Sequence, residues 1–392
     1  MSTDKKIPGR ITSAAAAWQA SRIADPVNRL RFLRHTVGDR CAVSPAILRE
    51  SRFWRTNRWK IVAAAFVALA WPAIEVSRSA SDLFTPVAAV LAKGLPAESR
   101  PNVWLLETQG GAEVWSNGLR IERRFEVPNE PRAYEAYPTG SISSPVPMSA
   151  PAGIVYHTTE SHLAPLEEEQ NHRLRVIGTT LLQFIRENKS YHYVIDRFGR
   201  VWRVVRESDA ANHAGNSVWA DPQYAYLNLN RSFLGISVET QTAAGGEETP
   251  ATPAQVHALK VLTEMLRSKY SIPAANCVTH AQVSVNPSNR QVGYHYDWGA
   301  KFPYAAAGLP DNYAMPIPAI WLFGFTYDPS LVKVTGERYW QGLAKAEERM
   351  RQDATRSGMP PETYRKGLWQ RYGELYSRVK NQAGSAAALE SN

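Results

Sequence analysis

Hydrophobic and polar residues alternate with two different periods between residues 150 and 310. Short apolar runs at 153–157 and 233–240 have the length and the β-branched content of buried strands. Between 253 and 270, apolar residues recur about every 3.6 positions, as on one face of a helix, and Thr252 provides an N-cap. Strands that alternate with helices predict an α/β domain.

The segments on either side of this region have patterns of their own. Residues 102–127 alternate like strands, and Asn117-Gly118 is a strong hairpin signal that is expected to add strands to the sheet or to cover its face. Residues 138–151, rich in Pro and Ser, are interpreted as a linker. Two helices are predicted at 336–357 and 361–381, and the last ten residues, rich in Ala, Ser and Gly, are predicted to be disordered.

Positive charge is concentrated near the N-terminus. The net charge is +9, and residues 1–60 contain 13 Lys and Arg against 4 Asp and Glu, which accounts for the whole excess. The rest of the chain is neutral overall. A nucleic-acid-binding domain needs basic residues in its folded part, so no nucleic-acid partner is expected.

An apolar segment at 61–74 follows the basic arm directly. It is about 14 residues long, fewer than the roughly 20 of a typical membrane-spanning helix. Lys and Arg ahead of such a segment favour a cytoplasmic N-terminus. A single-pass signal anchor in the membrane is the first interpretation, and a cleaved signal peptide and a buried soluble helix are the alternatives.

Three residues have the setting of a catalytic zinc site: His157, His280 and Asp297. Each histidine ends an apolar run, and Asp297 follows the second run closely. Imidazole and carboxylate groups suit Zn²⁺, and three protein ligands leave one coordination position for water. The chain has two cysteines, Cys41 and Cys277, which excludes a site built from four cysteines. A zinc-bound water ionises near neutral pH and attacks carbonyl groups, so hydrolysis is the predicted reaction class.

Six motifs surround these residues in a fixed order. They are Ile154-Val155-Tyr156-His157-Thr158-Thr159, Ser190-Tyr191-His192-Tyr193-Val194-Ile195-Asp196-Arg197-Phe198-Gly199-Arg200-Val201-Trp202, Asn212-His213-Ala214-Gly215-Asn216, Leu234-Gly235-Ile236-Ser237-Val238-Glu239, Val278-Thr279-His280 and Asp297-Trp298-Gly299. Together they resemble the zinc-dependent N-acetylmuramoyl-L-alanine amidases of type 2, a family that includes the peptidoglycan recognition proteins. The resemblance covers roughly residues 150–310. It implies a mixed central β-sheet flanked by helices, zinc as the cofactor, and peptidoglycan or muropeptides as partners.

The resemblance also implies roles for residues around the metal. Tyr191 and His295 are predicted to be catalytic, stabilising the oxyanion or assisting the leaving amine, although many family members have a lysine where His295 stands. His213 and Asn216 are predicted to bind substrate. For His213, a positioning or packing role is the alternative.

The general base is left open between two carboxylates. Bacterial members of the family often have a catalytic glutamate where this chain has Ser237. Glu239 lies two residues further along, hence on the same strand face, and Glu160 follows His157 closely. Each of these two glutamates is a possible general base.

These features divide the chain into five expected segments. They are a basic cytoplasmic arm at 1–58, a membrane anchor or signal segment at 59–76, a linker with a β-hairpin extension at 77–150, the zinc amidase domain at 151–310, and a C-terminal helical extension with a disordered tail at 311–392.

The predicted function is hydrolysis, by a zinc-activated water, of the amide between N-acetylmuramic acid and L-alanine in peptidoglycan. One alternative is a peptidoglycan-binding recognition module with little or no turnover, and another is a different zinc amidohydrolase. Because peptidoglycan lies outside the cytoplasmic membrane, the catalytic domain is expected on the external or periplasmic side of that membrane. The sequence leaves the oligomeric state and the stem-peptide preference open.

Overall fold

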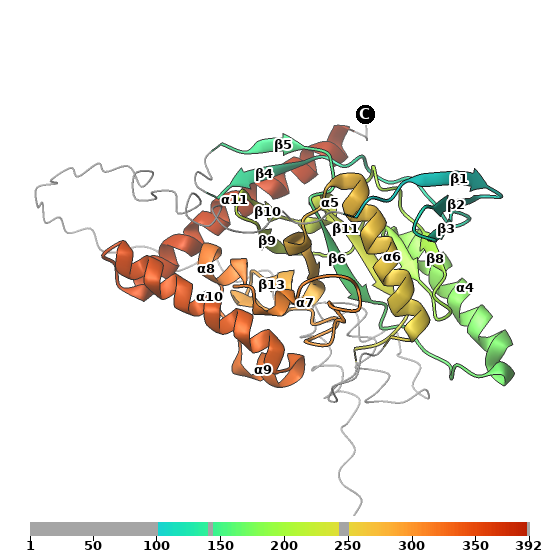
Figure 1. Ribbon diagram of the computed structural model, residues 1–392. Coiled ribbons are helices and arrows are strands. Elements are labelled where there is room, and N and C mark those ends of the chain that lie inside the picture. The colour runs from blue at the N-terminus through green and yellow to red at the C-terminus, as the bar shows by residue number, and fades with distance from the viewer. Residues whose placement is uncertain (1–100, 140–143, 243–250, 390–392) are drawn as a thin grey trace, which may run out of the picture. The chain divides into compact units, whose positions relative to one another are not determined.

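The computed structural model describes residues 101–139, 144–242 and 251–389 (Figure 1). The expected basic arm at 1–58 and the expected membrane segment at 59–76 lie outside these ranges. Within the described ranges, no helix combines the length and the apolar character that crossing a membrane requires.

In the described part of the chain, a mixed sheet of eight strands has the order β1-β2-β3-β8-β7-β11-β6-β12. Its strands are β1 (Leu105–Gln109), β2 (Ala112–Trp115), β3 (Arg120–Glu122), β6 (Gly153–Thr158), β7 (Tyr193–Ile195), β8 (Val201–Arg203), β11 (Phe233–Val238) and β12 (Cys277–Thr279). Strands β7, β11, β6 and β12 run parallel to one another, whereas β8 is antiparallel to β7. The predicted α/β fold with a mixed central sheet is confirmed.

Helices lie on both faces of this sheet (Figure 1). On one face, α6 (Pro253–Tyr270) joins Tyr156 and Ile236 in one hydrophobic cluster. On the other face, α4 (Asn171–Asn188) packs in a cluster with Val194. Because neighbouring residues of a strand point to opposite faces, each strand contributes side chains to both layers.

Local sequence explains where these two helices begin and end. The Thr252 side chain accepts a hydrogen bond from the backbone N–H of Gln255, and the Gln255 side chain accepts one from the backbone N–H of Thr252. This reciprocal capping box fixes the predicted start of α6. Ser271 and Lys189, both with left-handed backbone, end α6 and α4.

The strands before residue 130 extend the central sheet at one end. Strands β2 and β3 pair antiparallel, and Asn117-Gly118 lies in the turn between them, with Gly118 at φ +83°. The predicted hairpin is therefore confirmed. Strand β3 pairs with β8, which attaches the hairpin to the rest of the sheet.

A smaller sheet within the described residues has the order β5-β4-β10-β9. Its strands are β4 (Tyr134–Pro138), β5 (Val146–Met148), β9 (Val218–Ala220) and β10 (Tyr224–Leu227). The interpretation of 138–151 as a linker is wrong in part, because β5 lies inside it and pairs with β4. Pro147 is tolerated there because β5 is an edge strand, which needs hydrogen bonds on one side only.

The two helices expected near the C-terminus are present and pack into the same hydrophobic cluster as α6. They are α10 (Glu337–Arg356) and α11 (Pro361–Leu389), and Gly358 lies between them at φ +64°. Because α11 continues to Leu389, most of the tail predicted to be disordered is helical. The helix continues through this segment because alanine has the highest helix propensity of all residues.

Short elements connect the larger ones. They are η4 (Glu168–Gln170), α5 (Leu229–Ser232), η5 (Ala274–Asn276), α7 (His280–Val283), β13 (Val285–Asn286), β14 (Gln291–Val292), η6 (Asn312–Ala314), α8 (Pro318–Phe323) and α9 (Pro329–Thr335). Of these, α7 matters most for the site, because it begins with a candidate metal ligand.

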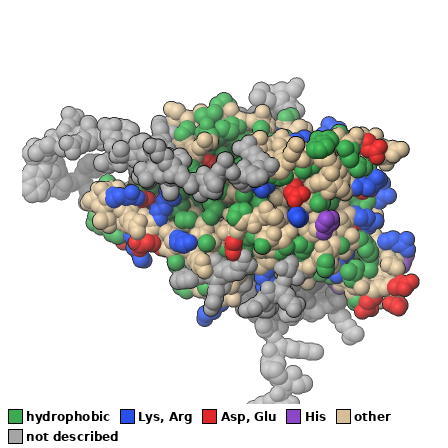
Figure 2. All heavy atoms as spheres, viewed as in Figure 1, with side chains coloured by type: hydrophobic (Ala, Val, Ile, Leu, Met, Phe, Trp, Pro, Cys, Tyr) green, Lys and Arg blue, Asp and Glu red, His purple; other side chains and the backbone are tan. Residues whose placement is uncertain are grey.

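Charged side chains of both signs are interspersed on the face drawn in Figure 2. The composition after residue 60 is balanced in the same way, with 32 basic and 32 acidic residues. On this face, the described residues therefore do not form a broad basic surface of the kind that binds nucleic acid.

Candidate metal centre

The candidate ligands come from two neighbouring strands and one loop. His157 lies near the end of β6, and His280 begins α7 directly after β12. Strands β6 and β12 are parallel neighbours, so their carboxyl ends meet at one edge of the sheet. Asp297 lies in the loop after β14, immediately before Trp298, whose φ of 69° is in the left-handed region. The fold thus joins residues that are up to 140 positions apart.

His157, His280 and Asp297 converge on one point. Oδ2 of Asp297 lies 3.2 Å from Nδ1 of His157 and 3.2 Å from Nδ1 of His280. The centroids of the two imidazole rings are 4.5 Å apart, and possible ligand atoms of all three residues lie within 4.8 Å of one another. In a tetrahedral zinc site with bonds of about 2.0–2.2 Å, neighbouring ligand atoms lie roughly 3.3–3.6 Å apart. The observed spacing is close to this value.

One nitrogen in the cluster, His280 Nδ1, has no hydrogen-bond partner among the described residues. It is buried, and it lies 3.2 Å from Asp297 Oδ2. A buried polar atom without a partner is destabilising. A cation between the nitrogen and the carboxylate would satisfy both groups. The residues present therefore fit a zinc ion.

The other nitrogen of each candidate ligand is tied to the protein. His280 Nε2 lies 3.3 Å from the carbonyl oxygen of Ala214, and His157 Nε2 lies 3.1 Å from Nδ1 of His213. His213 Nε2 in turn lies 3.3 Å from the carbonyl oxygen of Phe233. Because a carbonyl only accepts, His280 and His213 donate from Nε2, and His213 Nδ1 accepts from His157 Nε2. In their neutral forms, both candidate ligand histidines therefore direct a free Nδ1 lone pair toward the site.

The charge states inside the cluster are those that a metal ion needs. Burial, assisted by the nearby His280, lowers the pKa of His157 to about 4. Burial alone would raise the pKa of Asp297, but the electrostatic interaction with His280 and the close contact with His157 hold that pKa well below its usual range. A neutral His157 and an ionised Asp297 are thus the forms present near neutral pH, and both can coordinate zinc.

His213 lies behind His157 and is buried. Asn230 Oδ1 accepts hydrogen bonds from the backbone N–H groups of His213 and Ala214, at 2.9 and 2.6 Å. A Cβ at Gly235 would lie 2.5 Å from the His213 ring, so glycine in β11 makes room for it. This placement favours the positioning alternative for His213 over the predicted contact with substrate.

Asn216, the other residue predicted to bind substrate, is exposed on the same loop. Its Oδ1 accepts a hydrogen bond from the hydroxyl of Tyr376 at 3.0 Å, and its carbonyl accepts one from the backbone N–H of Val285. Tyr376 belongs to α11, so the C-terminal extension reaches the loop that supports the candidate ligands. No pattern in the sequence indicated this contact.

Glu160 holds the loop that carries Asp297. Its Oε1 accepts hydrogen bonds from Thr158 Oγ1 at 2.6 Å and from the backbone N–H of Thr242 at 2.7 Å. Thr242 Oγ1 accepts in turn from the backbone N–H of Trp298, the residue after Asp297. These bonds favour a supporting role for Glu160 over that of a general base.

Ser237 and Glu239 lie on the strand beside His157. Ser237 is in register with His157, and its Oγ is buried with no hydrogen-bond partner within the described part of the chain. Glu239 lies just past the end of β11, where its Oε2 accepts from the backbone N–H of Arg197 at 3.1 Å. Burial raises the pKa of Glu239 to about 7. Glu239 thus has the proton affinity that a general base near neutral pH requires.

Tyr191 and His295 lie on either side of the two ligand histidines. The Tyr191 ring centroid is 5.1 Å from that of His157. The His295 ring stacks on His280, with 4.8 Å between centroids and 18° between planes. The structure therefore brings both predicted catalytic residues to the metal cluster.

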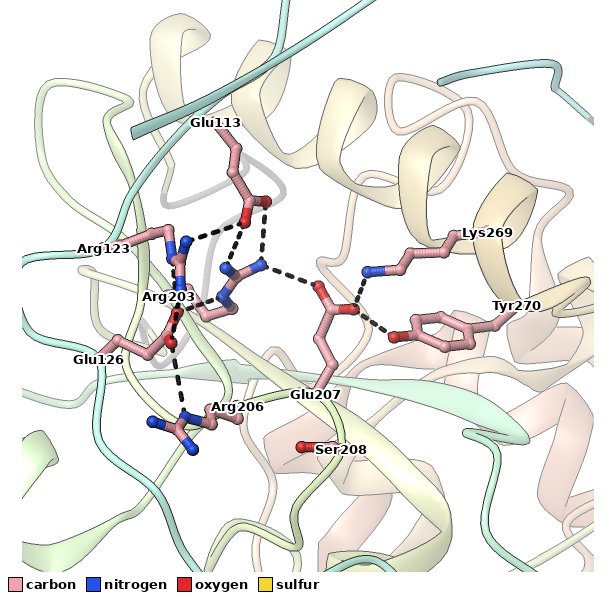
Figure 3. Close-up of a pocket in the computed structure, with 9 residues that line it drawn as sticks. All are labelled: Glu113, Arg123, Glu126, Arg203, Arg206, Glu207, Ser208, Lys269 and Tyr270. Carbon is pink, nitrogen blue, oxygen red and sulfur yellow. Dashed lines mark hydrogen bonds and ion pairs between the residues drawn. The ribbon is translucent and has the colours of Figure 1, made fainter. Parts of the chain in front are cut away.

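A second polar cluster surrounds Arg203 (Figure 3). It lies on the opposite face of the sheet from His157, because Tyr156, the neighbour of His157, belongs to the face that α6 covers. Arg203 pairs with Tyr193 across β7 and β8, and Tyr193 belongs to the face that α6 covers. Figure 3 shows the Arg203 guanidinium among three carboxylates, at 2.5 Å from Glu113, 2.7 Å from Glu126 and 3.4 Å from Glu207. The cluster borders a cavity of about 360 Å³.

The charges of the Arg203 cluster are paired with one another. Glu207 accepts hydrogen bonds from Lys269 Nζ, at 2.6 Å, and from the hydroxyls of Tyr193 and Tyr270. Burial would raise the pKa of Glu126, but hydrogen bonds from the Arg123 and Arg203 guanidinium groups lower it to about 2. The cluster links the hairpin strand β2 to β8 and α6, and its geometry explains attachment of the extension rather than catalysis.

Comparison with known proteins relates the segment that contains this cluster to a known family. Residues 147–299 match the family model described as N-acetylmuramoyl-L-alanine amidase. The N-acetylmuramoyl-L-alanine amidase AmiD of Escherichia coli strain K12 is 35% identical over 89 residues, which are 22% of this chain and 31% of AmiD. The aligned segment thus spans about a third of that relative.

Two solved structures are similar to parts of the chain. The complex of E. coli AmiD with anhydro-N-acetylmuramic acid-L-Ala-D-gamma-Glu-L-Lys has a TM-score of 0.33 at 21% identity, covering 61% of this chain and 97% of the AmiD chain. AmpDh3 from Pseudomonas aeruginosa, in complex with an anhydromuramic pentapeptide, has a TM-score of 0.30 at 21% identity, covering 54% and 70%.

The chain carries a domain of the type 2 N-acetylmuramoyl-L-alanine amidase family. The region that matches the family model contains His157, His280 and Asp297. The three residues that converge in the structure are therefore all inside the family domain.

Proposed function

We propose that this chain is a zinc-dependent peptidoglycan amidase that hydrolyses the amide between N-acetylmuramic acid and L-alanine. Membership of the amidase family supports the reaction class. The observation that carries the proposal is the arrangement of His157 and His280, whose Nε2 atoms are held by the protein while both Nδ1 atoms face Asp297. Most buried polar groups of a folded protein are paired, so a His280 Nδ1 that has no hydrogen-bond partner among the described residues, at 3.2 Å from a carboxylate, supports a bound cation.

Residues around the cluster have separate tasks in this proposal. Zinc bound by His157, His280 and Asp297 would supply an activated water and polarise the substrate carbonyl. Tyr191 and His295, which flank the two histidines, donate hydrogen bonds to the oxygen that becomes negative in the tetrahedral transition state.

Proton transfer is assigned to Glu239 in preference to Glu160. Glu160 Oε1 already accepts two hydrogen bonds from the loop that carries Asp297. Glu239 has a pKa of about 7, close to the optimum for a base that must take and return a proton near neutral pH.

A peptidoglycan-recognition module with little turnover is the second candidate. Ser237 favours it, because a hydroxyl stands beside His157 where a carboxylate could have acted as a base. Turnover separates the two functions directly. The amidase should release peptides that begin with L-alanine from purified sacculi, and it should lose this activity on dialysis against a chelator and regain it with Zn²⁺. Binding of sacculi without release of peptides would instead establish the recognition module.

We also propose that the amidase domain lies outside the cytoplasmic membrane, anchored by residues 59–76. The basic residues ahead of the apolar segment and the location of peptidoglycan support this arrangement. An alkaline phosphatase reporter fused after residue 150 should be active, and one fused before residue 58 should be inactive. Inactivity of the first fusion would exclude export of the domain.

A further inference from the structure

We infer that a cavity beside the C-terminal helix binds the N-acylated sugar that precedes muramic acid in the glycan strand. The inference rests on the proposed amidase function and names a second part of its substrate. The cavity has a volume of about 350 Å³, at the lower end of the range for small-molecule sites. Six residues form most of its wall: Asn216, Leu227, Asn228, Asn230, Tyr372 and Tyr376.

The loop that forms one wall of this cavity also supports the metal cluster. His213 and Ala214 contact His157 and His280, and Asn216 of the cavity wall follows two residues later. Asn230, which also lines the cavity, holds the backbone of His213 and Ala214. The cavity is therefore built on the same loop that holds both candidate ligand histidines.

The cavity offers the two kinds of surface that a sugar ring needs. Tyr372 and Tyr376 of α11 are stacked, with 5.5 Å between ring centroids and 20° between planes, and they form an apolar wall suited to the C–H face of a pyranose. Asn216, Asn228 and Asn230 provide side-chain amides, which can pair with hydroxyl groups and with the acetamido group.

Asn228 provides a polar atom that a ligand in the cavity could contact. Its Oδ1 is buried and has no hydrogen-bond partner among the residues that the structure describes. Its backbone is left-handed, at φ 58°, a conformation that asparagine tolerates better than most residues. A polar ligand in the cavity would give this oxygen the donor that the protein does not provide.

Charge distinguishes a sugar from the peptide stem as the occupant. Among the described residues that line the cavity, only Lys380 is charged, and it is exposed. A peptide with several carboxylates would need more cations than one. A neutral N-acylated hexosamine needs none.

Two substrates that differ by one sugar test the inference with the full-length chain. They are N-acetylmuramoyl-L-alanyl-D-isoglutamine and the same molecule extended by N-acetylglucosamine. In the wild type, kcat/KM should be higher for the disaccharide. Asn228→Gly, which keeps the left-handed backbone and removes the amide, should lower the disaccharide-to-monosaccharide ratio by about 3- to 10-fold, as expected for one lost hydrogen bond. Tyr376→Ala should lower the same ratio.

Two controls separate the cavity from general effects. Ser271→Gly makes the same backbone change at an exposed left-handed position outside the cavity, φ 56°, and should leave the ratio unchanged. Lys380→Ala removes the one charge at the cavity and should also leave it unchanged, whereas an equal loss on both substrates in Lys380→Ala would indicate a peptide occupant and overturn the inference.

The outcomes also separate this inference from the amidase proposal. A wild type that cleaves both substrates, with the same ratio in Asn228→Gly, overturns the sugar site and leaves the amidase intact. A wild type that cleaves neither substrate refutes the amidase. Equilibrium dialysis with N,N′-diacetylchitobiose then decides the inference: weaker binding to Asn228→Gly than to Ser271→Gly supports the sugar site, and equal binding overturns it.

Discussion

The Arg203 cluster and the Asp297 cluster lie on opposite faces of the central sheet. They differ in whether every polar group has a hydrogen-bond or ion-pair partner within the described part of the protein. Around Arg203, carboxylates, cations and hydroxyls satisfy one another. Around Asp297, His280 Nδ1 lies close to the carboxylate without a hydrogen bond to any described residue. The first cluster is complete as it stands, whereas the second would be completed by the proposed zinc ion. A cavity alone therefore does not identify the functional site, because the complete Arg203 cluster borders a cavity of about 360 Å³.

Among the substitutions that test this difference between the clusters, Asp297→Ala is expected to have the largest effect, on zinc content and on peptidoglycan hydrolysis. Removing the carboxylate leaves only two imidazole ligands, so zinc should be lost and peptidoglycan hydrolysis should fall by roughly 10³-fold or more. Elemental analysis and a sacculus-release assay measure the two effects. Asp328→Ala, which alters an exposed helix cap, is the matched control and should retain zinc. Full zinc content in Asp297→Ala would end the proposed metal site.

Arg203→Ala should break the complete cluster instead. Three carboxylates, of which Glu113 and Glu207 are buried, would lose their shared cation, and the free energy of unfolding should fall by roughly 3–5 kcal/mol. Urea unfolding measures it, with Arg120→Ala as the control, because the ion pair of Arg120 with Glu122 is exposed and contributes about 0–1 kcal/mol. The folded fraction of Arg203→Ala should still bind zinc. Loss of zinc at unchanged stability would show that the two clusters are not separate.

Glu239→Gln alters a buried carboxylate that accepts a hydrogen bond from a backbone N–H, whereas the carboxylates around Arg203 pair with a guanidinium. Burial raises the pKa of Glu239 from 4.5 to about 7, so between these pH values the folded chain keeps a proton that the unfolded chain releases. Stability contributed by this group is therefore present at low pH and is lost as the pH rises through that window, by up to about 3 kcal/mol. The variant should lack this loss when unfolding is compared at pH 5 and pH 8.

The control for this comparison is Glu374→Gln, which alters an exposed carboxylate on α11 and should unfold like the wild type at both pH values. If Glu239 acts as the base, Glu239→Gln should also lower kcat. A wild-type kcat in the variant would return the assignment of the base to Glu160 or to solvent.

His295→Ala probes the edge of the incomplete cluster. If His295 stabilises the oxyanion or the leaving amine, kcat should fall by roughly 10²-fold while zinc content stays unchanged. Steady-state kinetics on a soluble muropeptide, together with elemental analysis, gives both values. Activity equal to that of the wild type would reduce His295 to a packing partner of His280.

The smallest effect is expected from His213→Gln, which alters the group behind the metal ligand. Losing the acceptor for His157 Nε2–H should weaken zinc binding by about 10- to 100-fold, while activity recovers at high zinc concentration. Competition with a chromogenic chelator measures the affinity. His257→Gln, on the exposed side of α6, is the control. An unchanged zinc affinity would assign His213 to packing.

Features that depend on neighbouring residues were predictable from the sequence. The Asn117-Gly118 turn and the Thr252 cap are local signals, and the structure contains both. His157 and His280 stood out because each ends a short apolar run, and parallel strands bring such ends to one edge of a sheet. A signal for the position of His213 was also present, since Gly235 interrupts an apolar strand and glycine there indicates the close approach of another group.

Features that depend on distant residues were not predictable. The carboxylates around Arg203 lie as far as 90 positions away, and Tyr376 reaches Asn216 across 160 positions. Spacing and periodicity contain no information about such pairs, because they arise only after the sheet and the C-terminal helices have packed. The same limit explains why β5 was not predicted. Its proline-rich sequence does not indicate a strand, and it forms one only by pairing with β4 along one edge.

The packing of α10 has a practical consequence for protein engineering. The Tyr339 hydroxyl donates to the carbonyl of Ala281, next to His280, and Gly342 is so close to the carbonyls of Tyr313 and Met315 that a Cβ would lie 2.5–2.6 Å from them. A fragment that stopped at residue 310 would lose these contacts and uncover part of the shared core. The shortest portable unit is therefore much longer than the recognisable family segment, and shuffling experiments should exchange the C-terminal helices together with the amidase domain.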